Sequence, residues 1–172
     1  MPFWKNELQK ARLQLKDKKN GNPRIAILGI GSELNGDDAA GVFIARELRQ
    51  VFAERPPRDD LVIYDCGTLP ENFSGPLRKF APDMVLILDA GSFDEAPGQV
   101  RLTTTDDIDG LSFSTHSLPP SIFAKFLTEE LDCVVLLLLI QAENVDFCAP
   151  LNNQVELAVQ ETVRELAHFL QG

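Results

Sequence analysis

Apolar residues along the chain form short, nearly continuous runs that alternate with segments in which they recur every third or fourth position. Continuous runs are typical of strands covered on both faces, because a half-exposed strand alternates apolar and polar residues. Residues 99–103 do alternate, and we expect an edge strand there. Strands are predicted at residues 24–29, 61–66, 84–90 and 133–140, and the runs at 84–90 and 133–140 predict burial on both faces.

Segments with helical spacing separate these strands. Near the N-terminus, apolar residues from Trp4 to Leu15 recur at steps of four, three and four, which places them on one stripe of an amphipathic helix. A second helix is predicted after Asp37, and the side chain of Asp37 or Asp38 is placed to cap it. Further helices are predicted at residues 71–80, 120–131 and 155–170.

Alternating strands and helices predict an α/β fold, with a mostly parallel central sheet and helices on both faces. The length of 172 residues fits a single domain. We assign residues 1–22 to an N-terminal helix and linker, with the helix ending near Lys16, and residues 23–172 to the domain itself. The sequence leaves open whether the N-terminal helix packs on the domain or on a partner chain.

Composition and charge narrow the function classes. The chain has 16 basic and 26 acidic residues and a net charge of −10, which disfavours binding to nucleic acid or to an anionic membrane. The apolar run at 134–140 is too short to cross a membrane, and no secretory signal is visible, so we expect a cytoplasmic protein without membrane insertion. Three cysteines without a C-x-x-C pair predict reduced thiols rather than disulfides or a zinc site.

Two glycines, Gly29 and Gly31, mark the end of the first predicted strand and the start of the loop after it. They do not support a dinucleotide site. Leu34 stands where the third glycine of the fingerprint belongs, and the acids at 37–38 would repel a pyrophosphate. The acid that would bind the ribose is expected about 20 residues further on. Asp65 comes 65 − 31 = 34 residues after Gly31.

Acidic residues follow several predicted strands, at the sheet edge where ligands of such folds gather. Asp38 follows the first strand and would otherwise be a plain helix cap. Asp89 directly follows a strongly apolar strand, where a carboxylate requires a partner or an ion. His116 lies in a polar loop, whereas His168 in the last helix is better explained by packing or solvation. Asp38, Asp89 and His116 together predict an open metal site with oxygen and nitrogen ligands.

Other hydrolase chemistries find less support in the sequence. No G-x-S-x-G motif occurs, and neither Ser114 nor Ser117 lies on a strand-to-helix turn, so a serine hydrolase is not predicted. The segment from Asp89 to Ser92 only superficially matches the D-T-G motif of pepsin-like proteases, which have an unrelated all-β fold.

Four motifs in order, GIGSELNGDDAAGV, DCGTLPEN, LILDAGS and STHSLPP, resemble those of the nickel-iron hydrogenase maturation endopeptidases. The similarity is greatest to the branch that processes hydrogenase 3, and it extends from Arg24 to the C-terminus. The resemblance implies a mostly parallel sheet with flanking helices that presents two acids and one histidine to a divalent metal. The matching residues are Asp38, Asp89 and His116, which would serve both catalysis and metal binding.

The resemblance also implies the reaction. Such an enzyme, of the aspartic-type peptidase class, cuts a C-terminal extension from a hydrogenase large-subunit precursor after nickel insertion. Nickel would be carried by the substrate and bound transiently, with no organic cofactor. Ser32 replaces the usual Asn of the family, and Ala39 departs from its pattern after the acid pair, so contacts between the first loop and the substrate are expected to differ. A nickel carrier or chaperone without hydrolytic activity, and an unrelated nucleotide-binding module, remain as alternatives.

Overall fold

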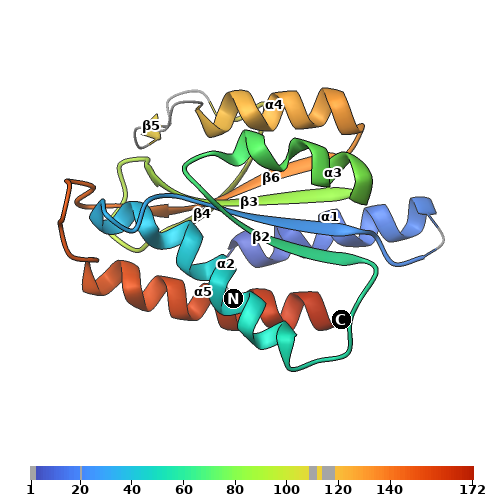
Figure 1. Cartoon of the computed structure of the whole chain (residues 1–172), viewed down its shortest axis with the longest axis horizontal. Helices are drawn as coiled ribbons and strands as arrows, with labels where there is room; N and C mark the ends of the chain where they lie inside the picture. Colours follow the sequence, from blue (N-terminus) through green and yellow to red (C-terminus); the bar gives the residue numbers. More distant parts are fainter. Residues whose placement is uncertain (1–2, 20, 109–111, 114–118) are drawn as a thin grey trace.

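The computed structural model describes residues 3–19, 21–108, 112–113 and 119–172 as one sheet flanked by helices (Figure 1). The strands are β1 (Ile25–Ile30), β2 (Leu61–Gly67), β3 (Met84–Ser92), β4 (Val100–Thr104), β5 (Ser112–Phe113) and β6 (Val134–Gln141). The α-helices are α1 (Phe3–Lys19), α2 (Ala40–Ala53), α3 (Ser74–Phe80), α4 (Pro120–Leu131) and α5 (Asn153–Gln171). Two short 3-10 helices, η1 (Gly36–Ala39) and η2 (Pro70–Phe73), directly precede α2 and α3.

The strand order in the sheet is β2-β1-β3-β6-β4, with β5 paired to the end of β3. Strands β2, β1, β3 and β6 run parallel, whereas β4 and β5 are antiparallel to their neighbours. This confirms the predicted mostly parallel α/β sheet, and β4 is the edge strand that the alternating pattern indicated. The expected helix at 71–80 is divided, because η2 forms its first turn and α3 the remainder.

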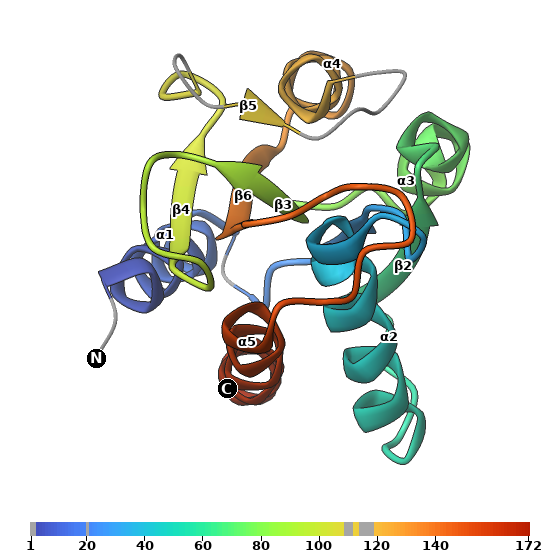
Figure 2. The same ribbon diagram turned by 90° about the vertical axis from the view of Figure 1, so that its left-hand side faces the viewer.

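Each central strand buries both of its faces, as the continuous apolar runs predicted. In β3, Leu86 and Leu88 belong to a core shared with α1, α2 and α5, whereas Val85 and Ile87 belong to a core shared with α3 and α4. Figure 2 shows the same division, with α3 and α4 on one side of the sheet and α1, α2 and α5 on the other. The two cores thus hold the sheet between two layers of helices.

The N-terminal helix packs on the domain. Trp4 and Leu8 of α1 are buried in the core beneath α5, and the guanidinium of Arg12 donates a hydrogen bond to the Phe169 carbonyl oxygen. The helix continues through Lys19, so the predicted end near Lys16 was too early. Among the helices of the described ranges, none is both long and apolar enough to span a membrane.

Candidate metal and catalytic site

The sheet topology singles out one position at the carboxyl ends of the strands. The chain passes from β1 to β2 on one side and then crosses over to β3 on the other side of β1. At such a switch point the connections after the two central strands diverge and leave a crevice, where parallel sheets bind their ligands. Here the switch point lies between the ends of β1 and β3. Asp38 lies on η1, in the connection that follows β1, and Asp89 lies in the second half of β3.

Asp38 lies on η1, directly before α2, and its side chain is 3% exposed. The Ser32 N–H donates to Asp38 Oδ2 over 2.9 Å, so the loop that leaves β1 closes back on this carboxylate. The expectation that Asp37 or Asp38 caps the helix was wrong. The cap position of α2 is held by Ala39, with no side-chain cap bond, because both acids lie within η1, which precedes the α-helix.

Asp89 lies in the second half of β3 and is 1% exposed. Its Oδ1 accepts the Ala90 N–H at 2.8 Å. The strand is central, because β1 pairs with one side of it and β6 with the other. A carboxylate at this depth lies within the sheet rather than on a surface loop, as the apolar sequence before it predicted.

Two glycines bring Asp38 close to the strand that bears Asp89. A Cβ atom on Gly41, in the first turn of α2, would lie 2.1 Å from the Leu88 carbonyl oxygen and 2.5 Å from that of Ile30. Gly31 has a φ of +143°, and a Cβ there would lie 1.8 Å from the Asp38 carbonyl oxygen. Gly31 and Gly41 therefore allow the backbone to pack closely at the switch point. This close packing explains why glycine occurs where the sequence superficially matches a nucleotide fingerprint.

Asp37 has a different role from its neighbour, which sequence reasoning missed. It is completely buried, and it accepts backbone N–H groups of the loop between β6 and α5. Oδ2 accepts from Glu143 at 2.8 Å and from Asn144 at 3.0 Å, and Oδ1 accepts from Asn152 at 2.7 Å. A buried carboxylate needs such donors. Asp37 thereby attaches a distant loop to the element that carries Asp38.

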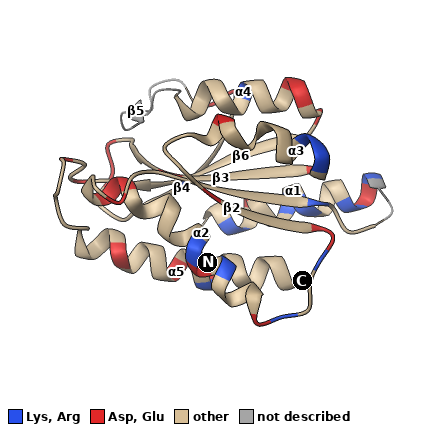
Figure 3. Cartoon of the chain, viewed as in Figure 1, with Lys and Arg blue, Asp and Glu red and all other residues tan. Residues whose placement is uncertain are grey.

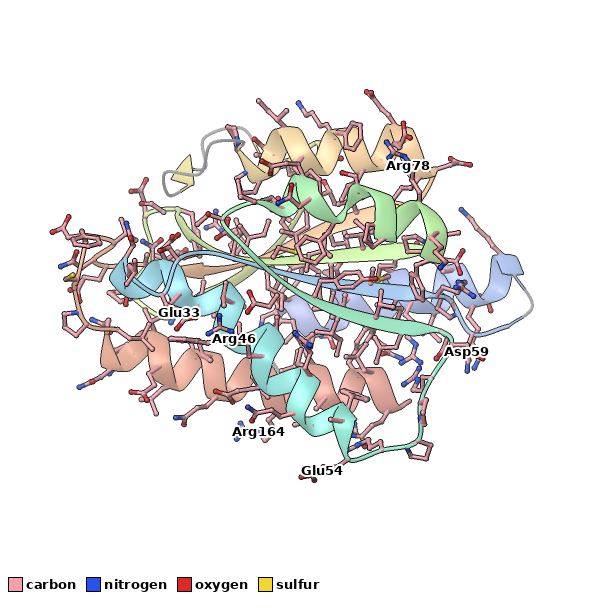
Figure 4. The ribbon with its side chains drawn as sticks, viewed as in Figure 1. Glu33, Arg46, Glu54, Asp59, Arg78 and Arg164 are labelled. Carbon is pink, nitrogen blue, oxygen red and sulfur yellow. The ribbon has the colours of Figure 1, made fainter. Side chains whose placement is uncertain are left out.

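The acid at the end of β2 is part of a surface ion pair. Asp65 Oδ2 accepts from Arg46 Nε at 2.5 Å, and Asp65 Oδ1 accepts the Gly67 N–H at 3.1 Å. The same guanidinium contacts Glu33 of the first loop, and both labelled side chains lie beside α2 in Figure 4. The hydrogen bond to Asp65 is the main reason why the pKa of Arg46 is raised. Asp65 therefore joins α2 to β2.

His116, the third predicted ligand, lies outside the described residues. On the near side of that stretch, Phe113 of β5 pairs with Gly91, two residues beyond Asp89 in β3. Within the described ranges, no three His, Cys, Asp or Glu side chains group so that they could hold a metal ion. The metal site formed by Asp38, Asp89 and His116 therefore stays a prediction.

The cysteines are free thiols, as predicted. Cys66 lies near the end of β2, in the DCGTLPEN motif, where burial first and the charge of Asp65 second raise the pKa of its thiol to about 12. Burial likewise raises the pKa of Cys133 to about 11. Neither side chain forms a thiolate at neutral pH, and the thiolate is the nucleophilic form. Cys66 is therefore unsuited to act as a nucleophile, although it lies near the carboxyl end of β2.

Comparison with known proteins identifies the class of enzyme. Residues 42–168 match the hydrogenase maturation protease family HycI. The hydrogenase 3 maturation protease of Escherichia coli K12 is 30% identical over 141 residues, which cover 81% of this chain and 86% of that protein. A relative in Methanocaldococcus jannaschii, assigned to the hydrogenase maturation proteases, is 34% identical over 160 residues, with 91% and 94% covered.

Solved structures agree with the sequence matches. The crystal structure of the NiFe hydrogenase maturation protease HycI from Thermococcus kodakarensis superposes with a TM-score of 0.78 at 28% identity, covering 92% of this chain and 99% of that one. The chain belongs to the hydrogenase maturation protease family. Membership makes it a peptidase that acts in the maturation of a hydrogenase, which confirms the class predicted from its motifs.

Proposed function

We propose that this peptidase removes the C-terminal extension of a nickel-iron hydrogenase large-subunit precursor after nickel insertion. In this proposal Asp38, Asp89 and His116 recognise the nickel that the precursor carries. The observation that supports it best is the burial of Asp38 and Asp89 at the switch point of a sheet that belongs to a maturation protease. The precursor and its metal are substrates here, and the enzyme requires no resident organic cofactor.

The positions of the two acids favour a shared cation. The backbone of Asp38 packs against Gly31, one residue after β1, and Asp89 follows Leu88, which pairs with Gly29 in the neighbouring strand. Both acids are buried near the ends of these two strands, and carboxylate oxygens are ligands that suit a divalent cation.

The ligand set also suits a metal that arrives with the substrate. Two carboxylates and one imidazole leave coordination positions open for groups of the precursor. One carboxylate at such a centre is placed to accept a proton from the water that attacks the peptide bond. Because the Cys66 thiol stays protonated at neutral pH, attack by water is preferred over a cysteine nucleophile. In this proposal the enzyme belongs to the aspartic-type peptidase class.

The decisive experiment compares nickel-loaded with nickel-free precursor. We expect the wild-type enzyme to shorten only the loaded form, as a loss of mass from the large subunit. Asp38→Asn, Asp89→Asn and His116→Ala should each reduce the cleavage rate about a hundredfold or more, since ligands and their immediate partners have effects of this size. Asp146→Asn is the matched control, because Asp146 is exposed on the loop after β6 and loses the same charge.

Three results would contradict the proposal in different ways. Equal cleavage of loaded and nickel-free precursor would show that nickel is not the signal. Full activity in Asp38→Asn and Asp89→Asn would place the site elsewhere. Nickel binding through the three residues without any loss of mass from the precursor would identify a nickel carrier instead of a protease.

A further inference from the structure

A groove lies away from the buried acids, between the edge strand β2 and helix α3. Its volume is about 890 Å³. The C-terminal end of α3, which carries the basic residues Arg78 and Lys79, lies near the amino ends of the strands (Figure 3). Its wall combines apolar or aromatic side chains with cations: Val62, Tyr64, Phe80, Arg24, Arg58 and Lys79.

The strand beside this groove has an unused hydrogen-bonding edge. Within the described ranges β2 pairs only with β1, and Figure 2 shows it at the margin of the sheet. The Ile25 N–H donates to the Asp60 carbonyl oxygen, and Ile25 is in register with Leu61. Because successive residues of a parallel strand alternate between its two sides, the N–H and C=O groups of Leu61, Ile63 and Asp65 point away from β1. An extended peptide could pair with these groups.

The charges of the groove favour an anionic peptide. Arg24 is held against the wall, with its guanidinium 4.5 Å from the centre of the Phe80 ring and its Nε donating to the Phe80 carbonyl oxygen at 2.9 Å. Lys79 is exposed in the last turn of α3. Arg58 is already bonded to Asp60, and Asp59 is the acid among the lining residues (Figure 4). Arg24 and Lys79 are thus available to a carboxylate in a chain whose net charge is −10.

The other end of this edge adjoins the proposed site. The Gly31 N–H donates to the Gly67 carbonyl oxygen at 2.9 Å, which joins the end of β2 to the first loop. The next residue of that loop, Ser32, donates to Asp38. A peptide that leaves the buried acids can therefore continue directly along the outer edge of β2. It would reach the cations after the length of the strand.

We infer that the outer edge of β2 binds the precursor segment that follows the cleaved bond, as an added strand. The inference rests on the proposed function. Because this segment starts at the carboxyl end of β2 and runs toward the amino end, it pairs antiparallel. A strand rises about 3.3 Å per residue, so the distance from Asp65 to Leu61 is covered by about five residues. An acidic side chain of the extension about five to seven residues beyond the cut then meets Arg24 and Lys79.

A charge reversal tests the basic end of the groove. Lys79→Glu and Lys125→Glu both replace an exposed helical lysine and change the net charge equally, but Lys125 lies on α4, outside the groove. For cleavage of nickel-loaded precursor we expect Lys79→Glu to raise KM about threefold to fivefold with kcat unchanged, because it removes a contact made equally in ground and transition states. The effect should shrink at high salt. Lys125→Glu should stay within about twofold of the wild type.

A second pair of variants tests the backbone edge. Ile63→Pro removes an outward N–H, and proline is tolerated on an edge strand in that position. Ile63→Thr changes the side chain but keeps the N–H. We expect Ile63→Pro to raise KM about fivefold, the equivalent of one net hydrogen bond, and Ile63→Thr to change it much less. Should the proline variant be unfolded, amide exchange in the wild type still decides, since the released extension, added as a synthetic peptide, should slow exchange at Leu61, Ile63 and Asp65.

The peptide itself identifies the carboxylate. Replacing the acidic side chains of the synthetic extension with amides should weaken its binding, whereas amidating only its C-terminus should not. Unchanged KM in Lys79→Glu, together with unchanged exchange at the edge amides while the wild type cuts the precursor, would overturn the inference and leave the proposed function intact. Failure of the wild type to cut any nickel-loaded precursor would overturn both.

Discussion

Helix α1 and the short helix η1 lie on the same side of the sheet, but different kinds of contact hold them in place. Apolar contacts hold α1, with Trp4 and Leu8 in the core and an ion pair between Lys5 and Glu165 at 2.7 Å on the outside. Close backbone packing and hydrogen bonds hold η1, through Gly36, where a Cβ atom would lie 2.4 Å from the Asn144 carbonyl oxygen, and through the three N–H groups that Asp37 accepts. The contacts that hold η1 are directional, whereas the apolar contacts that hold α1 are not.

This difference corresponds to what each element carries. A helix held by side-chain packing tolerates small shifts, because apolar contact is not directional. An element that places a charged side chain beside a strand end has to be held within about half an ångström, which rigid backbone and hydrogen-bond contacts achieve. Directional contacts are also less tolerant of substitution, since a buried polar group that loses its partner is strongly destabilising. Substitutions in the two elements should therefore differ in size.

The largest effect is expected from Asp37→Ala. It leaves three N–H groups of the β6–α5 loop without their acceptor and detaches that loop from η1. We expect the free energy of unfolding to fall by about 4 kcal/mol, since each of three hydrogen bonds to a charged acceptor contributes roughly 1.5 kcal/mol. Urea denaturation measures this, and cleavage of the precursor should be lost as well.

Its neighbour supplies the control. In Asp38→Asn the amide oxygen can still accept the Ser32 N–H, so stability should fall by about 1 kcal/mol or less while cleavage is lost. The two adjacent acids would then separate stability from activity. Equal loss of stability in both variants would show that Asp37 is no more structural than Asp38.

A pair of glycines gives the next effect. Gly41→Ala places a Cβ within 2.1 Å of the Leu88 carbonyl oxygen, so α2 must move away from the ends of β1 and β3. We expect a loss of about 2 to 3 kcal/mol and strongly reduced cleavage. Gly75→Ala in α3 meets no atom within 4 Å and should instead stabilise the protein by about 0.5 kcal/mol. A Gly41→Ala protein as stable and active as Gly75→Ala would refute close packing as the reason for Gly41.

The fold could largely be predicted because it depends on side-chain periodicity. The runs that became β3 and β6 are apolar at successive positions, and the β4 segment alternates, so both their place and their burial follow from the sequence. The end of α1 was missed because Lys16 to Lys19 are helix-compatible residues, and nothing in the pattern marks the last turn. Similarly, no periodicity distinguishes η2 from the start of an α-helix.

The site could be predicted only in part. The burial of Asp89 was predictable, because this carboxylate directly follows a strongly apolar run of the same strand. The role of Asp37 was not, since its partners Glu143, Asn144 and Asn152 are more than a hundred residues away and contribute only backbone groups, which every sequence possesses. For the same reason the close approach at Gly41 left no pattern in the sequence. Such contacts come from tertiary geometry rather than from residue type.

The smallest effect concerns α1 and its pH dependence. The hydrogen bond from Lys5 is the main cause that lowers the pKa of Glu165 below its ordinary value of 4.5. A lowered carboxyl pKa contributes stability above the unfolded value and loses it as pH falls through the folded value, so this contribution is complete at neutral pH and disappears below 4.5. Lys5→Gln should therefore weaken α1 docking at pH 7 by a few tenths of a kcal/mol, roughly the range of a surface ion pair, and this difference should diminish as pH falls below 4.5. Trp4, the single tryptophan, lies on α1 and is 6% exposed, so its emission reports docking of this helix. Lys10→Gln, which breaks an ion pair within α1, is the control, and a pH-independent difference between the two variants would contradict the assignment.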